Sequence, residues 1–210
     1  MEIADSFGIY IPTLPNTTIK LSSLVETMIN NGTVECLNDD DTIGPFAVTI
    51  VRKHVIHNHP STKDESTPGL GEILDIMFAK YPRALEHLAS GAPKNVTIQG
   101  FNKHRKAHNL SVKVDLDPKT KRYLRLLGKA LTELGYPNVM ASNTHLSLAK
   151  FSKNIERPNG IKRVTDKAER SARILGLYEN NGLSLGRLVI GATYDSPHPN
   201  YEEFLEQHKI

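Results

Sequence analysis

The chain has 210 residues, of which 39% are hydrophobic and 23% are charged, a composition that predicts a soluble globular protein with its own core. Its net charge of +3 permits an anionic ligand but does not indicate a binding track for long nucleic acids. The single cysteine, Cys36, excludes an internal disulfide and a cysteine-based zinc site, and no segment approaches the roughly 18 apolar residues of a membrane span. We therefore expect a cytoplasmic protein with neither a signal peptide nor a membrane segment.

The first quarter of the chain predicts a strand, a helix and a second strand. Residues 7–11 are typical of a strand, and residues 19–30 have apolar side chains at helical spacing. A polar loop over residues 38–41 then leads to a strand over residues 46–52. The acidic residues of this loop lack the ligand spacing of a calcium site, so we interpret the loop as a solvated turn.

The middle of the chain predicts a second group of elements. Residues 53–94 are less regular and indicate one helix over about residues 71–89, followed by strands over residues 95–103 and 109–116. Asp117 as a cap and Pro118 in the first turn begin a helix that runs to about residue 134. A strand over about residues 144–151 follows.

The last quarter of the chain is basic, but its lysines and arginines are mixed with Asp166 and Glu169. We interpret this segment as a solvated face, with a phosphate-facing lid as the alternative, and expect a helix over about residues 165–177. A last strand is expected over residues 185–194, and Tyr201, Phe204 and Leu205 are expected to dock the polar tail.

The order strand, helix, strand thus occurs twice, over residues 7–52 and 109–151. We predict an α+β fold with two pseudo-symmetric lobes whose antiparallel sheets surround a central cleft. The predicted single bilobal domain spans residues 1–210 and comprises lobe 1 (about 1–52), an insertion (53–94), lobe 2 (about 95–151) and a C-terminal extension (152–210).

The strand at residues 144–151 carries the strongest candidate for chemistry. Alternation directs Leu146 and Leu148 to the core, and His145, Ser147 and Ala149 to the opposite face. An imidazole can transfer a proton near neutral pH, and a nearby hydroxyl can donate a hydrogen bond to an oxyanion. Such a pair on one strand is more often without a role, so the upstream strand matters.

Residues 46–50 have the same pattern as residues 144–148, with Thr49 in the place of Ser147 and Ala47 in the place of His145. With these two stretches the chain resembles the 2H phosphoesterase superfamily, whose two lobes each carry a His-x-Thr/Ser motif. The resemblance covers roughly residues 7–151 and, more loosely, the strand expected over residues 185–194. Among the branches of that superfamily, the chain is most similar to the bacteriophage anti-CBASS phosphodiesterases, which cleave the cyclic oligonucleotide messengers of a bacterial defence system.

Two histidines that face each other across a cleft can act as base and acid on one phosphodiester. Thr49 and Ser147 can donate hydrogen bonds to the non-bridging oxygens, where charge develops in the transition state. This chemistry requires no metal and no cofactor. The resemblance therefore implies a metal-independent phosphodiesterase with His145 as one of the two proton-transfer groups.

Ala47 departs from the family pattern, because an alanine has no proton to exchange. Since a general acid or base contributes roughly 10²–10⁴-fold, we expect severely reduced turnover with binding largely kept. Ala47 is either an engineered replacement of histidine that traps the substrate or the natural residue of a protein that only binds. The intact Thr49 and flanking pattern favour the engineered replacement.

Three further residues are candidates for ligand binding. Tyr10, on the first strand, can stack on a nucleobase, although a half-buried strand tyrosine is an equal alternative. Arg52 and Lys150 follow the two motifs at similar positions and can neutralise phosphate, although lysines and arginines are common on any surface.

The segment His54 to Pro60 supports a rival interpretation, because its His-x-His-Pro run, with His54 just upstream, is similar to the opening of the zinc motif in JAMM-type and RadC-like proteins. The carboxylate that should complete this motif is missing at the required spacing. Zinc would then have only His57 and His59 as ligands, too few to fix its geometry. A third possibility is a protein that binds nucleotides without cleaving them.

We therefore predict a phosphodiesterase whose preferred substrate is a cyclic di- or oligonucleotide messenger, acting in the host cytoplasm if a bacteriophage encodes it. A 2′,3′-cyclic phosphate at an RNA end is the nearest alternative substrate. The sequence leaves open the bases, the ring size, the assignment of acid and base, and the oligomeric state.

Overall fold

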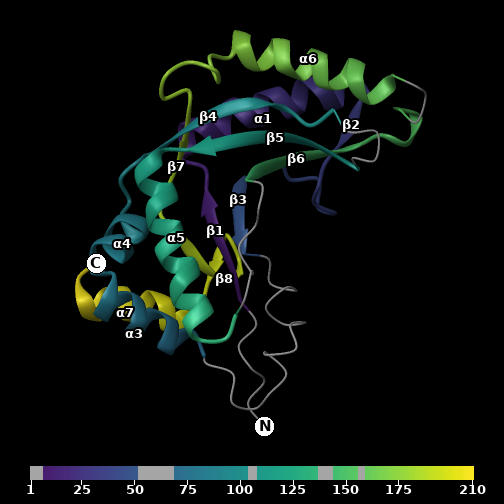
Figure 1. Cartoon of the computed structure of the whole chain (residues 1–210). Coiled ribbons are helices and arrows are strands. Elements are labelled where there is room, and N and C mark those ends of the chain that lie inside the picture. Colours follow the sequence, from purple (N-terminus) through teal and green to yellow (C-terminus); the bar gives the residue numbers. More distant parts are fainter. Residues whose placement is uncertain (1–6, 52–68, 104–107, 137–143, 156–158) are drawn as a thin grey trace.

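The fold of the chain, given by a computed structural model, is an α+β arrangement built on an antiparallel sheet (Figure 1). The structure describes residues 7–51, 69–103, 108–136, 144–155 and 159–210. Within these ranges every strand pair is antiparallel, as the sequence predicted. The strands are β1 (Gly8–Pro12), β2 (Val34–Glu35), β3 (Ala47–Val51), β4 (Lys94–Phe101), β5 (Asn109–Leu116), β6 (His145–Phe151), β7 (Leu183–Leu185), β8 (Val189–Thr193) and β9 (Ser196–Pro197).

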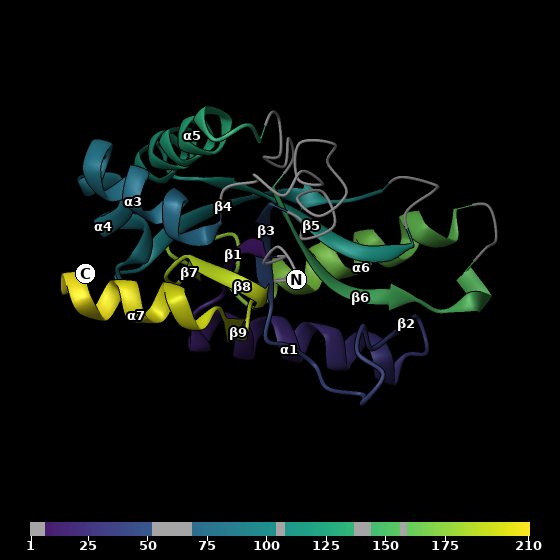
Figure 2. The same cartoon turned by 90° about the horizontal axis from the view of Figure 1, so that it is seen from below.

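The described helices form two groups. Helices α1 (Pro15–Asn30) and α6 (Gly160–Ile174) pack on each other at one end of the molecule, where α6 also contacts β4 (Figure 1). The second group surrounds the other end (Figure 2) and consists of α3 (Leu70–Lys80), α4 (Pro82–Ala89), α5 (Pro118–Glu133) and α7 (Pro199–His208). A short 3-10 turn, η2 (Lys153–Ile155), follows β6. No helix within the described ranges is long and apolar enough to cross a membrane.

The strand order, β7-β4-β5-β6-β3-β1-β8-β9 with β2 on β6, divides the sheet into two halves. One half contains β4, β5 and β6, and the other contains β3, β1 and β8. The halves meet where β3 pairs with β6 through one registered residue pair, Val48 opposite Leu146. Both side chains are fully buried. The two strands selected from the sequence are therefore neighbours at the centre of the sheet.

Several predicted boundaries were wrong for local reasons. Helix α1 begins at Pro15 rather than residue 19, because a proline in the first turn lacks only an N–H group that would have no helical partner. The single helix predicted over residues 71–89 is two helices, α3 and α4, separated at Tyr81 before Pro82. The helix predicted over residues 165–177 begins at Gly160 and ends at Ile174.

The C-terminal part of the chain completes the sheet. The strand predicted over residues 185–194 is present as β8 over residues 189–193, which pairs with β1, while the separate strand β7 ends at residue 185 and pairs with β4. The predicted polar tail contains α7, where Tyr201 and Leu205 are buried and Phe204 is partly buried. The Tyr201 hydroxyl donates a hydrogen bond to the Leu188 carbonyl at 2.8 Å. The docking predicted for this segment is confirmed.

Candidate active site

The pairing of β3 with β6 brings the two motif positions together. Since the strands are antiparallel about Val48 and Leu146, a local two-fold axis through this pair exchanges the residues on either side of it. Position 47 corresponds to His145, and Thr49 corresponds to Ser147. The first residue of each motif therefore lies opposite the last residue of the other motif. Position 47 is opposite Ser147, and Thr49 is opposite His145.

These four residues line one pocket with a volume of about 260 Å³. All four side chains are partly exposed, while the residues between them, Val48 and Leu146, point into the core. The remaining lining residues come from β1, α1, β6, the segment before β3, the end of β8 and the residue after it; they are Tyr10, Val25, Cys36, Leu37, Asn38, Thr42, Ile43, Gly44, Pro45, Phe46, Leu148, Thr193 and Tyr194.

Tyr10 lies beside Thr49, its registered partner across β1 and β3. Its ring lies over Gly8, where a Cβ atom would overlap the tyrosine ring and hydroxyl. The ring also contacts Tyr194 edge to face, with centroids 6.2 Å apart and planes at 80°. Burial raises the pKa of both tyrosine hydroxyls above its ordinary value, so both remain neutral hydrogen-bonding groups at physiological pH.

One wall of the pocket is the loop predicted as a solvated turn, and the structure has a turn there. The Asp40 carboxylate accepts hydrogen bonds from the Thr42 backbone N–H at 3.1 Å and from its hydroxyl at 2.7 Å. The Asn38 amide donates to the Thr42 hydroxyl at 3.0 Å. The hydrogen bonds from Thr42 lower the pKa of Asp40. Asn38 and Thr42 are thereby fixed at the edge of the pocket.

No protein-family model matches the chain, and no curated protein matches it in sequence. In structure the chain is similar to Usb1 of Kluyveromyces marxianus, at a TM-score of 0.47 and 14% sequence identity over 89% of this chain and 94% of Usb1. The same protein with uridine monophosphate is similar at a TM-score of 0.45 and 13% identity, over 90% and 96% of the two chains. Similarity of this degree does not define an activity, so the chemistry must be inferred from the pocket itself.

The structure brings together five of the seven residues selected from the sequence: Tyr10, Ala47, Thr49, His145 and Ser147. Lys150 is not among the pocket-lining residues; its exposed ammonium group lies 3.8 Å from an Asp39 carboxylate oxygen. Arg52 lies outside the described residues, and so do His54, His57 and His59 of the rival zinc motif. Within the described residues, no group of three or more potential metal ligands occurs.

The predicted alternation fails at Ala149. The register between β5 and β6 shifts by one residue between the pairs Leu110–Ala149 and Ser111–Ser147, which interrupts the regular alternation of faces. Ala149 is fully buried, and Leu148 lies at the edge of the pocket. The shift ends the polar face of the strand after Ser147.

Two residues near the pocket could not be selected from the sequence. Lys113, on β5, is registered opposite His145, so the two side chains are on the same face of the sheet. Tyr194 follows β8 and reaches the pocket because β8 pairs with β1. Neither belongs to a recognisable motif. The basic segment after residue 151 contributes no described residue to the pocket, so the structure does not support the lid interpretation.

Proposed function

We propose that this pocket is the site of a metal-independent phosphodiesterase of the 2H type, which in this chain lacks one of its two proton-transfer groups. The observation that supports this proposal is the local two-fold relation between the motifs within a single pocket. Two equivalent positions on opposite sides of one phosphodiester suit the two proton transfers of such a reaction, because one proton leaves the nucleophile while another reaches the leaving oxygen.

In the complete site, His145 and a histidine at position 47 would share these transfers. One imidazole would take the proton from a water or a ribose 2′-hydroxyl as the new P–O bond forms. The other would protonate the leaving oxygen as its bond to phosphorus breaks. Thr49 and Ser147, across the strand pair from His145 and position 47, would donate hydrogen bonds to the non-bridging oxygens. Ala47 removes one transfer and leaves the binding groups in place.

For the substrate we propose a cyclic di- or oligonucleotide messenger, as in the bacteriophage anti-CBASS enzymes that the sequence resembles. The Tyr10 ring, fixed by Gly8 and Tyr194, provides an aromatic surface beside Thr49 on which a nucleobase can stack. The pocket is slightly smaller than the roughly 300–1,000 Å³ of ordinary ligand sites. It would therefore hold one phosphodiester and its nucleoside, which also suits the 2′,3′-cyclic phosphate of an RNA end.

The decisive experiment is cleavage by the Ala47→His variant. Cyclic dinucleotides, cyclic trinucleotides and 2′,3′-cyclic uridine phosphate are incubated with both proteins in EDTA, and the products are separated by chromatography. We expect Ala47→His to increase cleavage of one substrate class by roughly 10²–10⁴-fold. Ala47→Gln, which adds volume without a group that titrates near neutral pH, and the double variant Ala47→His/His145→Ala should show no increase.

A natural nucleotide-binding protein is the second candidate, and Ala47 itself is the observation that favours it. Such a protein would bind a cyclic nucleotide tightly by calorimetry and would not cleave it after Ala47→His. Activity of Ala47→His that requires added zinc and disappears in EDTA would instead support the zinc motif at residues 54–60. Neither result is compatible with the proposed phosphodiesterase.

A further inference from the structure

Helix α5 has a strongly basic surface that is separate from the pocket. Its residues 118–132 include no aspartate or glutamate. At 100° per residue the centre of its solvent face is occupied by Arg122, Arg125 and Lys129, all of them exposed. The opposite face is buried against α3 and α4 (Figure 2). We call Arg122, Arg125 and Lys129 the α5 stripe.

Among the described residues, the three side chains of the α5 stripe form no ion pair with a carboxylate. Within the same ranges, the ion pairs of α5 are formed by two residues beside the stripe. The Lys121 ammonium group lies 2.5 Å from an Asp115 carboxylate oxygen, and Glu133 pairs with Lys80. No ion pair in that part of the chain involves Arg122, Arg125 or Lys129. Three cations therefore occupy about 10.5 Å of one helix face, the length of about three nucleotides of a stacked strand.

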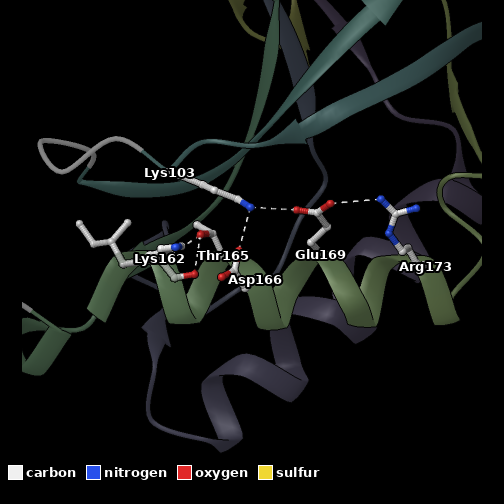
Figure 3. Close-up of polar contacts among 7 residues, drawn as sticks. Lys103, Lys162, Thr165, Asp166, Glu169 and Arg173 are labelled. Carbon is white, nitrogen blue, oxygen red and sulfur yellow. Dashed lines mark hydrogen bonds and ion pairs between the residues drawn. The ribbon is translucent and has the colours of Figure 1, made fainter. Parts of the chain in front are cut away.

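Helix α6 is equally rich in basic residues but has a different charge pattern. Its own carboxylates, Asp166 and Glu169, lie 2.7 Å and 3.3 Å from the Lys103 ammonium group, and Glu169 also pairs with Arg173 (Figure 3). Positive and negative groups therefore alternate along α6. The α5 stripe consists of positive side chains only. The two helices therefore allow a comparison, within one molecule, of a purely basic face with a face of mixed charge.

A second cavity, of about 450 Å³, lies at the N-terminal end of α5. Lys121 lines it and also borders the α5 stripe, so the two features are continuous. Besides Lys121, its polar lining has three amides, two hydroxyl residues and three carboxylates; they are Asn95, Asn180, Asn181, Thr97, Tyr178, Asp115, Asp117 and Glu179. Amides, hydroxyls and carboxylates can pair with the donors and acceptors on the edge of a nucleobase, and the volume is that of an ordinary small-ligand site.

We propose that α5 and this cavity form a binding site for single-stranded nucleic acid, with phosphates along the α5 stripe and one base in the cavity. The site shares no lining residue with the pocket of His145 and does not depend on the proposed phosphodiesterase. A lipid surface is a poorer partner, because the large exposed apolar side chains of the described residues are Ile19, Phe78 and Ile174, none of them on α5. The modest net charge of the whole chain does not indicate the local concentration of positive charge on α5.

The α5 stripe is tested with the triple variant Arg122→Ala/Arg125→Ala/Lys129→Ala in the full chain. Binding of fluorescent 12-nucleotide DNA and RNA strands is measured by anisotropy at several salt concentrations. Losing three phosphate contacts should weaken binding about tenfold or more at low salt and lower the salt slope by about two. The control is Arg163→Ala/Lys167→Ala/Arg170→Ala on α6, which removes the same charge. An equal loss in both variants, or no binding by the unmodified protein, overturns the proposal.

The cavity is tested with Thr97→Trp, which fills it from the exposed side of β4, and with the smaller change Asn95→Ala. Both should weaken binding of the oligonucleotides and leave binding of inorganic polyphosphate unchanged. Polyglutamate that binds as tightly as an oligonucleotide would identify an acidic protein as the partner and overturn the proposal, as would unchanged oligonucleotide affinity in both variants. His145→Ala should bind these strands normally, which separates this site from the proposed phosphodiesterase.

Discussion

At the scale of single residues, Gly8 determines where the Tyr10 ring can lie. A methyl group at position 8 would overlap this ring and its hydroxyl, so Gly8→Ala must displace Tyr10 from its place beside Thr49. We expect this variant to bind a cyclic nucleotide several-fold more weakly, since a stacked base contributes roughly 1–3 kcal/mol. Calorimetry measures the affinity, and Tyr10→Phe, which keeps the ring, should lose much less. Equal losses in the two variants would contradict a stacking role.

The register between β5 and β6 makes Lys113 a better candidate phosphate contact than Lys150. Neither lysine lines the pocket, but Lys113 is exposed opposite the pocket residue His145, whereas Lys150 lies near Asp39. Lys113→Met should weaken nucleotide binding by roughly twofold to fivefold, the range of one exposed ion pair, and the effect should shrink at high salt. Titrations of Lys113→Met and Lys150→Met at two salt concentrations compare the positions. A larger effect at Lys150 would favour the assignment made from sequence alone.

At the scale of elements, the start of α5 illustrates a feature that the sequence predicted in detail. The Asp117 carboxylate accepts hydrogen bonds from the Thr120 N–H at 2.9 Å and from its hydroxyl at 2.6 Å. Burial opposes the charge of Asp117, but the hydrogen bonds from Thr120 and Lys119 outweigh it and lower the pKa of this carboxyl.

Asp117→Ala should therefore lower the free energy of unfolding by about 0.5–2 kcal/mol at neutral pH. The pKa of Asp117 is lower in the folded chain than in the unfolded chain, where it is near 3.9. The stabilisation by the Asp117 carboxylate is therefore complete above the unfolded pKa and is lost as the pH falls through the folded pKa. Urea unfolding at pH 7 and pH 3 should show a smaller deficit for Asp117→Ala at the lower pH. Asp117→Asn, which keeps a capping side chain, is the control and should lose less at pH 7.

The accuracy of prediction from sequence followed the length and regularity of each element. Strands β3 and β6 alternate over several residues, and α5 has both a cap and a long apolar stripe, so these were predicted well. Strands β2 and β9 have two residues each, too few for any periodicity to be recognised. Ala47, Thr49, His145 and Ser147, which line one pocket, were selected from their pattern. Lys113 and Tyr194 were not, because their positions depend on which strands pair and in what register.

At the scale of the whole molecule, one buried lysine connects the stability of the fold to pH. Lys94 begins β4, is 2% exposed, and donates hydrogen bonds to the carbonyls of Ser90 at 2.9 Å and Ala92 at 3.4 Å. Burial lowers the pKa of Lys94 to about 8, although Asp117 partly opposes this shift. An unfolded lysine keeps its proton up to about pH 10.4. Between these values the unfolded chain therefore binds more protons than the folded one.

Global stability should consequently contain a term that rises with pH from about 8 towards 10, because deprotonation removes the cost of a buried charge in the folded state. We expect this term to disappear in Lys94→Met. Urea unfolding measures this term at pH 7.5 and pH 9.5. Between these two pH values the free energy of unfolding of the unmodified protein should rise by roughly 1–2 kcal/mol more than that of Lys94→Met. Lys153→Met, which removes an exposed charge, controls for net charge and should follow the unmodified protein. Parallel pH profiles for Lys94→Met and the unmodified protein would show that Lys94 keeps its proton in the folded state.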